Sequence, residues 1–286
     1  MRWIGGRESG NVDDRRGGGG GGMLVGGGIG TVIIAVIVFL LGGDPSALLS
    51  GGGGEPALTQ SPATQQADDQ AARFTRLVLG STEDTWTRIL AEQGQQYRPP
   101  TLVMFRRVTQ SGCGTASSAS GPFYCPADKK LYIDLSFYDE LARRFKAPGD
   151  FAMAYVIAHE VGHYLQDEFG IMDGLQSAQA RAGSRAAANQ LSVRLELQAD
   201  FLAGVWAHHA QGRSFEFEPG DVEEALRAAE AIGDDRIQQQ AQGYVVPDAF
   251  THGTSAQRVY WFSKGLKTGD LNQGDTFNSR EDANLQ

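Results

Sequence analysis

The run HEVGH at residues 159–163 lies inside an apolar stretch, residues 151–169, and constrains the fold more than any other feature. Positions four apart on a helix point the same way, so the imidazoles of His159 and His163 can bind one metal ion. Glu160 projects from an adjacent strip, within reach of a water-occupied position on that ion. Isolated ionisable groups are costly in a buried helix, so the pattern favours a zinc site with its own base over two surface histidines beside a solvated glutamate.

A catalytic zinc ion usually takes three protein ligands and keeps one position for water, so a second element must supply another ligand. Glu196 is the best candidate, in a helical stretch predicted over residues 189–210 whose other positions are largely apolar. Glu196 and Asp200 are four residues apart and share a face of that helix. We expect Glu196 to bind the ion and Asp200 to orient a ligand imidazole through its other ring nitrogen. The alternative is a solvated acidic stripe paired with Arg194.

A histidine and an arginine near the C-terminus extend the candidate site. His252 lies just before Ser255, the expected N-cap of the last helix. A histidine at such a junction can donate a hydrogen bond to the oxyanion that forms on an attacked carbonyl. Arg258 falls inside that helix and can form an ion pair with Asp200 or Glu196. The alternative for both residues is an ordinary place on the surface.

The chain resembles the bacterial predicted neutral zinc metallopeptidases, a membrane-anchored family. The likeness covers nearly the whole length and rests on these segments: Met1-Arg2-Trp3, Arg7-Glu8-Ser9, Gly121-Pro122-Phe123-Tyr124-Cys125-Pro126, the His159 motif, Leu195 to Asp200, and His252 to Arg258. More distantly, the segment Glu196 to Asp200 and the spacing from His252 to Arg258 are similar to membrane zinc proteases of the gluzincin class. Those distant relatives have several hydrophobic spans, whereas this chain has one.

The resemblance implies a zincin-like fold and a role for each matching residue. It implies these assignments: zinc ligands His159, His163 and Glu196, general base Glu160, and transition-state helper His252. Asp200 and Arg258 would support this set from outside the ligands. One zinc ion is the implied cofactor.

The N-terminus predicts where the site faces. Residues 23–43 carry no charge and, at about 1.5 Å per residue, just span a hydrocarbon core. Four arginines precede this segment and no Lys or Arg follows until Arg73, so residues 1–22 should be a disordered cytoplasmic stretch and the catalytic domain extracytoplasmic. The prediction is a single-pass protein of the bacterial inner (cytoplasmic) membrane, with a cleaved signal peptide as the alternative. Gly26 and Gly30 would favour a homo-oligomer through this helix.

The two cysteines agree with that topology. Cys113 and Cys125 flank a Gly- and Ser-rich loop. Outside the cytoplasm such a pair should form a disulfide, which would stabilise the fold by roughly 3 kcal/mol. The alternatives are two reduced thiols, or ligands of a second metal, which would need more Cys or His nearby.

Composition divides the rest of the chain into a flexible linker at 44–70, one domain at 71–267 and a polar C-terminal tail at 268–286. Inside the domain we predict a mostly helical α+β fold with a small sheet, behind the transmembrane helix. The expected helices are 82–93, 136–146, 151–169, 176–188, 189–210, 221–232 and 255–266, and the expected strands are 101–108 and 129–134. Strand 129–134 is a candidate for holding an extended substrate at a sheet edge, with an ordinary internal strand as the alternative.

The predicted function is a membrane-anchored zinc metallopeptidase that hydrolyses peptide bonds by zinc-activated water, with Glu160 as general base. One alternative is a zinc hydrolase of another amide, such as a cell-wall peptide. The other is a non-catalytic, membrane-tethered binding module that zinc only stabilises, although such a site would not need Glu160. The net charge of −9 and the pI of about 5.1, without a basic stripe, argue against nucleic acid as a partner and leave a peptide or protein substrate.

Overall fold

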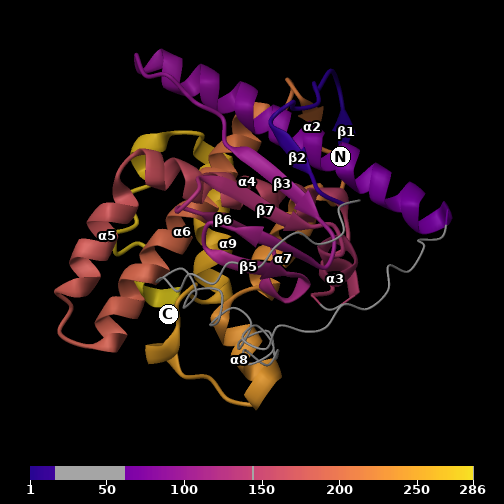
Figure 1. The fold of residues 1–286 in the computed structure, drawn as a ribbon. Coiled ribbons are helices and arrows are strands. Elements are labelled where there is room, and N and C mark those ends of the chain that lie inside the picture. The colour runs from indigo at the N-terminus through magenta and orange to yellow at the C-terminus, as the bar shows by residue number, and fades with distance from the viewer. Residues whose placement is uncertain (17–61, 144, 286) are drawn as a thin grey trace.

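The computed structural model describes residues 1–16, 62–143 and 145–285, which form a mostly helical α+β fold with small sheets (Figure 1). The strands are β1 Arg2–Trp3, β2 Val12–Asp14, β3 Thr101–Phe105, β4 Val108–Ser111, β5 Gly114–Ser117, β6 Phe123–Cys125, β7 Lys130–Asp134 and β8 Phe215–Glu216. The α-helices are α2 Pro62–Glu92, α3 Phe137–Arg143, α4 Asp150–Glu168, α5 Ile171–Ala180, α6 Arg185–Ala210, α7 Asp221–Ala231, α8 Asp234–Gln242 and α9 Ser255–Thr268. The 3-10 turns are η2 Ser118–Ser120, η3 Pro247–Ala249, η4 Leu271–Gln273 and η5 Ala283–Leu285.

The central sheet has the strand order β2-β3-β7-β6, in which β2, β3 and β7 are parallel and β6 is antiparallel to β7. Strand β7 lies between two neighbours, and Leu131 to Asp134 are all buried, as in a strand covered on both faces. The suggestion that this strand holds substrate at a sheet edge is therefore wrong. The edge that faces α4 is β6, whose contact with α4 is described below.

Helix α4 forms because it is apolar almost all round: most of its residues from Phe151 to Gln166 are buried. It follows Gly149, whose backbone has φ of +124°, a conformation that favours glycine. Helix α4 ends at Glu168, and the next helix, α5, ends at Ala180. Ser184 then caps α6 by accepting a hydrogen bond from the N–H of Ala187. The single helix predicted over 176–188 therefore covers the end of α5, a break, and the start of α6.

Helices α6 and α9 pack together closely because each presents a glycine to the other. A Cβ added at Gly265 would lie 2.1 Å from the carbonyl oxygen of Phe201, and one at Gly204 would lie 2.2 Å from that of Phe262. This approach sets α9 against the part of α6 that carries the acidic residues of the site. The N-cap of α9 is Thr254, which forms a capping box with the third residue of the helix, and not the expected residue one position later.

Residues 1–16, expected to be disordered, belong to the folded domain. Strand β1 pairs with β8. Strand β2 pairs in parallel with β3, beside which it lies in Figure 1. Between these strands, Ser9 Oγ and Asn11 Nδ2 donate to the buried carboxylate of Glu83 on α2 at 2.6 and 2.8 Å. The N-terminal residues and the rest of the domain are therefore parts of one body.

The predicted membrane topology is corrected by this arrangement. It placed residues 1–22 and the catalytic domain on opposite sides of a membrane, whereas β1 and β2 pair with strands of that domain. Across the residues that the structure describes, no helix combines the length and the apolar character that a bilayer crossing requires. The prediction of a single-pass inner-membrane protein with an extracytoplasmic domain is wrong on these findings. Residues 23–43, the predicted span, lie outside the described residues, as does most of the 44–70 linker.

The C-terminal segment, predicted as a polar tail, packs onto the domain. Asp282 is fully buried and accepts hydrogen bonds from Arg194 at 2.7 Å and from Gln257 at 2.7 Å. Thr276 is also buried and donates to the carbonyl oxygen of Arg194 at 2.6 Å. Because Arg194 is paired with the tail, the structure gives no support to the alternative in which it neutralises an acidic stripe around Glu196.

Candidate active site

Helix α4 brings the two histidines of the predicted motif together. His159 is buried, with 5% of its surface exposed, and His163 is half-buried. Their ring centroids lie 4.7 Å apart, with the planes nearly perpendicular. The spacing of four residues therefore places both rings on one side of the helix, as the sequence predicted.

Helix α6 supplies the third member of the cluster. Nε2 of His159 lies 3.2 Å from Oε2 of Glu196, and Nε2 of His163 lies 3.5 Å from Oε1 of the same carboxylate. One ligand atom from each of these three residues falls within 4.8 Å of the other two, the arrangement of a group that could hold a metal ion. In the part of the chain that the structure describes, this is the one such group.

A glycine allows the two helices to approach. A Cβ added at Gly162, between the two histidines, would lie 3.1 Å from both Cα and the carbonyl oxygen of Ala199 on α6. That is tighter than side-chain carbons normally pack, so a larger residue would push α4 and α6 apart. The small residues at this crossing thus help to bring Glu196 within reach of both imidazoles.

The donor set fits zinc because the far nitrogen of each ring is already engaged. Nδ1 of His159 lies 2.9 Å from Oδ1 of Asp200, and Nδ1 of His163 lies 2.9 Å from Oε1 of Gln166. Gln166 is itself fixed, since its Nε2 donates to the carbonyl oxygen of Leu195 at 2.8 Å. Zinc-binding histidines typically have such a partner on the second nitrogen, which fixes the ring and directs the other nitrogen at the metal. Two imidazoles and one carboxylate are a common set for a catalytic zinc ion.

Asp200 is the centre of a buried ionic network. Its Oδ2 accepts from Nε of Arg258 at 2.8 Å, and its Oδ1 accepts from the phenol of Tyr155 at 2.5 Å. Arg258 is 2% exposed and Asp200 is fully buried. Burial alone would raise the pKa of Asp200, but Arg258 and His159 lower it below its ordinary value. Arg258 therefore forms an ion pair with Asp200, one of its two predicted partners.

The metal-free cluster distributes its charge in a definite way. Burial alone would lower the pKa of His159, yet Asp200 and Glu196 raise it to about 10. Burial would raise the pKa of Glu196, but His163 and His252 lower it well below its ordinary value. The Glu196 carboxylate is therefore ionised and the His159 imidazole carries a proton that a metal ion would have to displace.

Glu160 lies beside this cluster and is held by the sheet. Its Oε2 accepts the main-chain N–H of Tyr124 on β6 at 2.8 Å. Burial raises the pKa of Glu160 above its ordinary value, while His163 and His159 act in the opposite direction. A carboxylate with a raised pKa beside a metal site is suited to taking up and returning a proton.

His252 is held by a residue that sequence reasoning missed. Asp234, at the start of α8, is fully buried, and its Oδ2 accepts the main-chain N–H groups of Thr251, His252 and Gly253 at 2.6, 2.6 and 3.0 Å. Its Oδ1 lies 3.1 Å from Nδ1 of the His252 ring. Burial would lower the pKa of His252, but Asp234 and Glu196 raise it. The ring is thus fixed at its Nδ1 and sits within electrostatic range of the cluster.

Of the other site residues that the sequence did not predict, some lie at helical spacing from a predicted residue and others do not. Gln166 is three positions after His163 on the same helix, so its spacing could have identified it. Tyr155 is four positions before His159 in the same way. Asp234 and Tyr124 act from distant elements, and no local spacing marks them.

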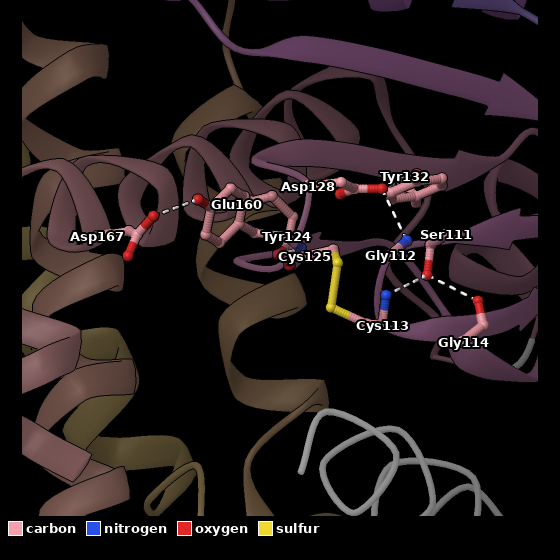
Figure 2. Close-up of a disulfide and its surroundings, with 10 residues drawn as sticks. All are labelled: Ser111, Gly112, Cys113, Gly114, Tyr124, Cys125, Asp128, Tyr132, Glu160 and Asp167. Carbon is pink, nitrogen blue, oxygen red and sulfur yellow. Dashed lines mark hydrogen bonds between the residues drawn. A yellow bond between two sulfur atoms is a disulfide. The ribbon is translucent and has the colours of Figure 1, made fainter. Parts of the chain in front are cut away.

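The predicted disulfide is present. Cys113 and Cys125 are bonded and join the tip of the β4–β5 hairpin to the edge strand β6 (Figure 2). Cys125 is fully buried against aromatic residues of the sheet.

Comparisons with known proteins agree with the geometry. A family model described as "Putative neutral zinc metallopeptidase" matches residues 1–277. The chain is 48% identical over 285 residues to a protein of Escherichia coli K12 named "Uncharacterized protein YpfJ", covering 97% of this chain and 99% of that one. It is 45% identical over 196 residues to "Uncharacterized protein Rv2575" of Mycobacterium tuberculosis H37Rv, covering 65% of this chain and 64% of that protein. No solved structure matches the chain significantly.

Proposed function

The chain belongs to the family described as putative neutral zinc metallopeptidases, and we propose that it hydrolyses peptide bonds with one zinc ion and Glu160 as general base. The observation that carries the proposal is the convergence of His159, His163 and Glu196, with ligand atoms within 4.8 Å of one another. A site that served only to stabilise the fold would have no use for a carboxylate such as Glu160 beside the ligands.

In this proposal His159, His163 and Glu196 hold the ion. When bound, zinc supplies Lewis acidity that acidifies a coordinated water and polarises a carbonyl. Asp200 and Gln166 keep the two imidazoles oriented through their Nδ1 atoms. Arg258 compensates the Asp200 charge, which would otherwise be costly in a fully buried place.

Glu160 does the proton transfers in two stages. It takes the proton from the attacking water, and it later delivers that proton to the leaving amine. The raised pKa of Glu160 favours both stages, because the carboxylate must be a fair base first and a fair acid afterwards.

His252 is proposed to stabilise the oxyanion that develops on the substrate carbonyl. Asp234 accepts from three main-chain N–H groups around His252 and contacts its Nδ1, so the loop and the ring are fixed before substrate arrives. The other ring nitrogen, Nε2, is then the one that can donate to the substrate. Preorganised donors of this kind lower the barrier without a rearrangement during the reaction.

The test is a proteome-derived peptide library treated with the zinc-loaded chain and with three variants. Wild type should cleave peptides, Glu160→Gln should retain zinc and show no turnover, and Glu196→Gln should lose both zinc and turnover. Glu168→Gln is the matched control, because this glutamate lies on the same helix and pairs with surface Lys129; it should cleave like wild type. Turnover by Glu160→Gln at the wild-type rate would contradict the assigned base. Muropeptides are treated in parallel, and their cleavage without cleavage of peptides would replace the peptide substrate by a cell-wall amide.

A further inference from the structure

Tyr124 of strand β6 makes two hydrogen bonds to helix α4 (Figure 2), and its ring packs edge-on against that of Tyr164 on the same helix. Its main-chain N–H donates to Oε2 of Glu160 at 2.8 Å, and its phenol donates to Oδ2 of Asp167 at 2.7 Å. Glu160 and Asp167 are seven residues apart, about two helical turns, so they lie on the same face of α4. One residue of the sheet thus spans two turns of the helix, and one end of that span is the proposed general base.

The strand is fixed from its other side by the disulfide. Cys125 follows Tyr124 directly and is bonded to Cys113 at the tip of the β4–β5 hairpin (Figure 2). The tip is fixed in turn, because the N–H of Gly112 donates to Oδ2 of Asp128 at 2.7 Å. Edge strand β6 is therefore held between the helix and a cross-linked hairpin, although it is only three residues long.

We propose that Tyr124 is a positioning residue for Glu160, an inference that rests on the general-base role proposed above. The main-chain N–H fixes Oε2 of Glu160, which leaves Oε1 to take up the proton. The bond from the phenol to Asp167 holds β6 against α4 and so keeps that N–H in place. Without it, the Glu160 carboxylate can rotate away from the orientation that proton transfer requires. Substrate binding does not depend on that orientation.

The first arm of the test is spectroscopic and needs neither metal nor substrate. In full-length chain labelled with 15N-tyrosine, the Tyr124 amide proton should resonate downfield because it donates to a carboxylate, and it should exchange slowly with solvent. Asp167→Ala should move this resonance upfield and speed its exchange about tenfold, the effect of losing one buried hydrogen bond. Glu168→Ala is the matched control. Glu168 is next to Asp167 and also pairs with Lys129, but it makes no hydrogen bond to Tyr124. An unchanged Tyr124 signal in Asp167→Ala would overturn the proposal.

The second arm is kinetic and uses zinc-loaded protein with a cleaved peptide. Tyr124→Phe should lower kcat about tenfold and leave KM unchanged, because only the orientation of the base is lost. Tyr164→Phe is the control: it removes a phenol that joins α4 to the main-chain oxygen of Arg98, and it keeps the ring that packs against Tyr124. It should keep the wild-type kcat. A Tyr124→Phe variant with wild-type kcat would overturn the positioning role.

The two arms separate this inference from the proposed function. If zinc-loaded wild type cleaves no peptide, the proposed function fails, and the amide measurement still decides whether Tyr124 and Asp167 hold the Glu160 contact. If wild type cleaves peptides, the amide signal responds only to Asp167→Ala, and Tyr124→Phe lowers kcat, both stand.

Discussion

Helix α6 and strand β6 both contact helix α4, but they hold it by different means. From α6 comes Asp200, which is fully buried and bonded to His159 and to the charged Arg258. From β6 come a main-chain N–H and a phenol, which reach the half-buried Glu160 and Asp167. Breaking a buried ion pair leaves an uncompensated buried charge, whereas removing a neutral donor from a half-buried carboxylate leaves a group that water can reach. The difference indicates that disrupting the α6 contacts would mainly destabilise the fold, whereas disrupting the β6 contacts would mainly disorder the Glu160 carboxylate.

The largest effect should come from the ionic network. Asp200→Asn should lower the free energy of unfolding by about 3–5 kcal/mol, because Arg258 is then buried without its counter-charge. Urea denaturation of the metal-free protein measures it. The double variant Asp200→Asn/Arg258→Met should lose less than the single variant, since it removes the unpaired charge. A double variant that loses as much as Asp200→Asn and Arg258→Met together would show that the pair is not coupled.

The disulfide tests the contribution of strand β6. Replacing Cys113 and Cys125 together by serine should lower the free energy of unfolding by about 3 kcal/mol, mainly by freeing the unfolded chain. Zinc affinity should stay within about twofold of wild type, because none of the three proposed ligands lies on β6 or the hairpin. Denaturation and zinc titration of the same preparation give both values. A marked loss of zinc affinity would show that the β6 contact with α4 also supports the three proposed ligands.

The contact between α6 and α9 should respond to one added methyl group. Gly265→Ala should destabilise the protein by about 1–3 kcal/mol, because the new Cβ would meet the carbonyl oxygen of Phe201 at 2.1 Å. Gly174→Ala, in helix α5 with nothing within 4 Å of the added carbon, is the control and should be neutral or slightly stabilising. Thermal unfolding compares the two. Similar losses in both would mean that helix propensity, and not the crossing, decides the outcome.

A smaller effect should appear with pH. The pKa of His159 is raised to about 10 in the metal-free protein, so its protonation contributes stability that is complete below pH 6.5 and lost as the pH rises towards 10. Zinc must displace this proton, so apparent zinc affinity should increase up to about tenfold per pH unit between pH 6.5 and 8.5. Calorimetry in buffers of different ionisation enthalpy should detect proton release on binding. Binding without proton release at pH 7.5 would contradict the assigned charge on His159.

The sequence could predict those parts of the site that local spacing encodes. His159 with His163, and Glu196 with Asp200, are pairs four residues apart on helices, and the structure brings all four together. Their metal-binding and supporting roles remain predictions. Tyr124 could not be predicted, because the group that reaches Glu160 is a main-chain N–H, which no side-chain pattern marks.

The fold was predicted less evenly than the site. The apolar helix α4 and the strand at 129–134 follow from their composition, but the number of neighbours of that strand depends on pairing with short distant segments. The N-terminal strands escaped prediction because residues 1–16 are polar and glycine-containing, and they fold only by pairing with β8 and β3. The topology prediction went wrong for the same reason, since it treated these residues as unstructured.

Zinc stoichiometry and affinity of three chains test the central claim most directly: wild type, Glu160→Gln and Glu196→Gln. Elemental analysis after dialysis, followed by competition with a chelator, gives both quantities. We predict one zinc ion per chain for wild type and Glu160→Gln with similar affinity, and a loss of at least about 100-fold for Glu196→Gln. Wild-type affinity in Glu196→Gln would contradict a site formed by α4 and α6 together.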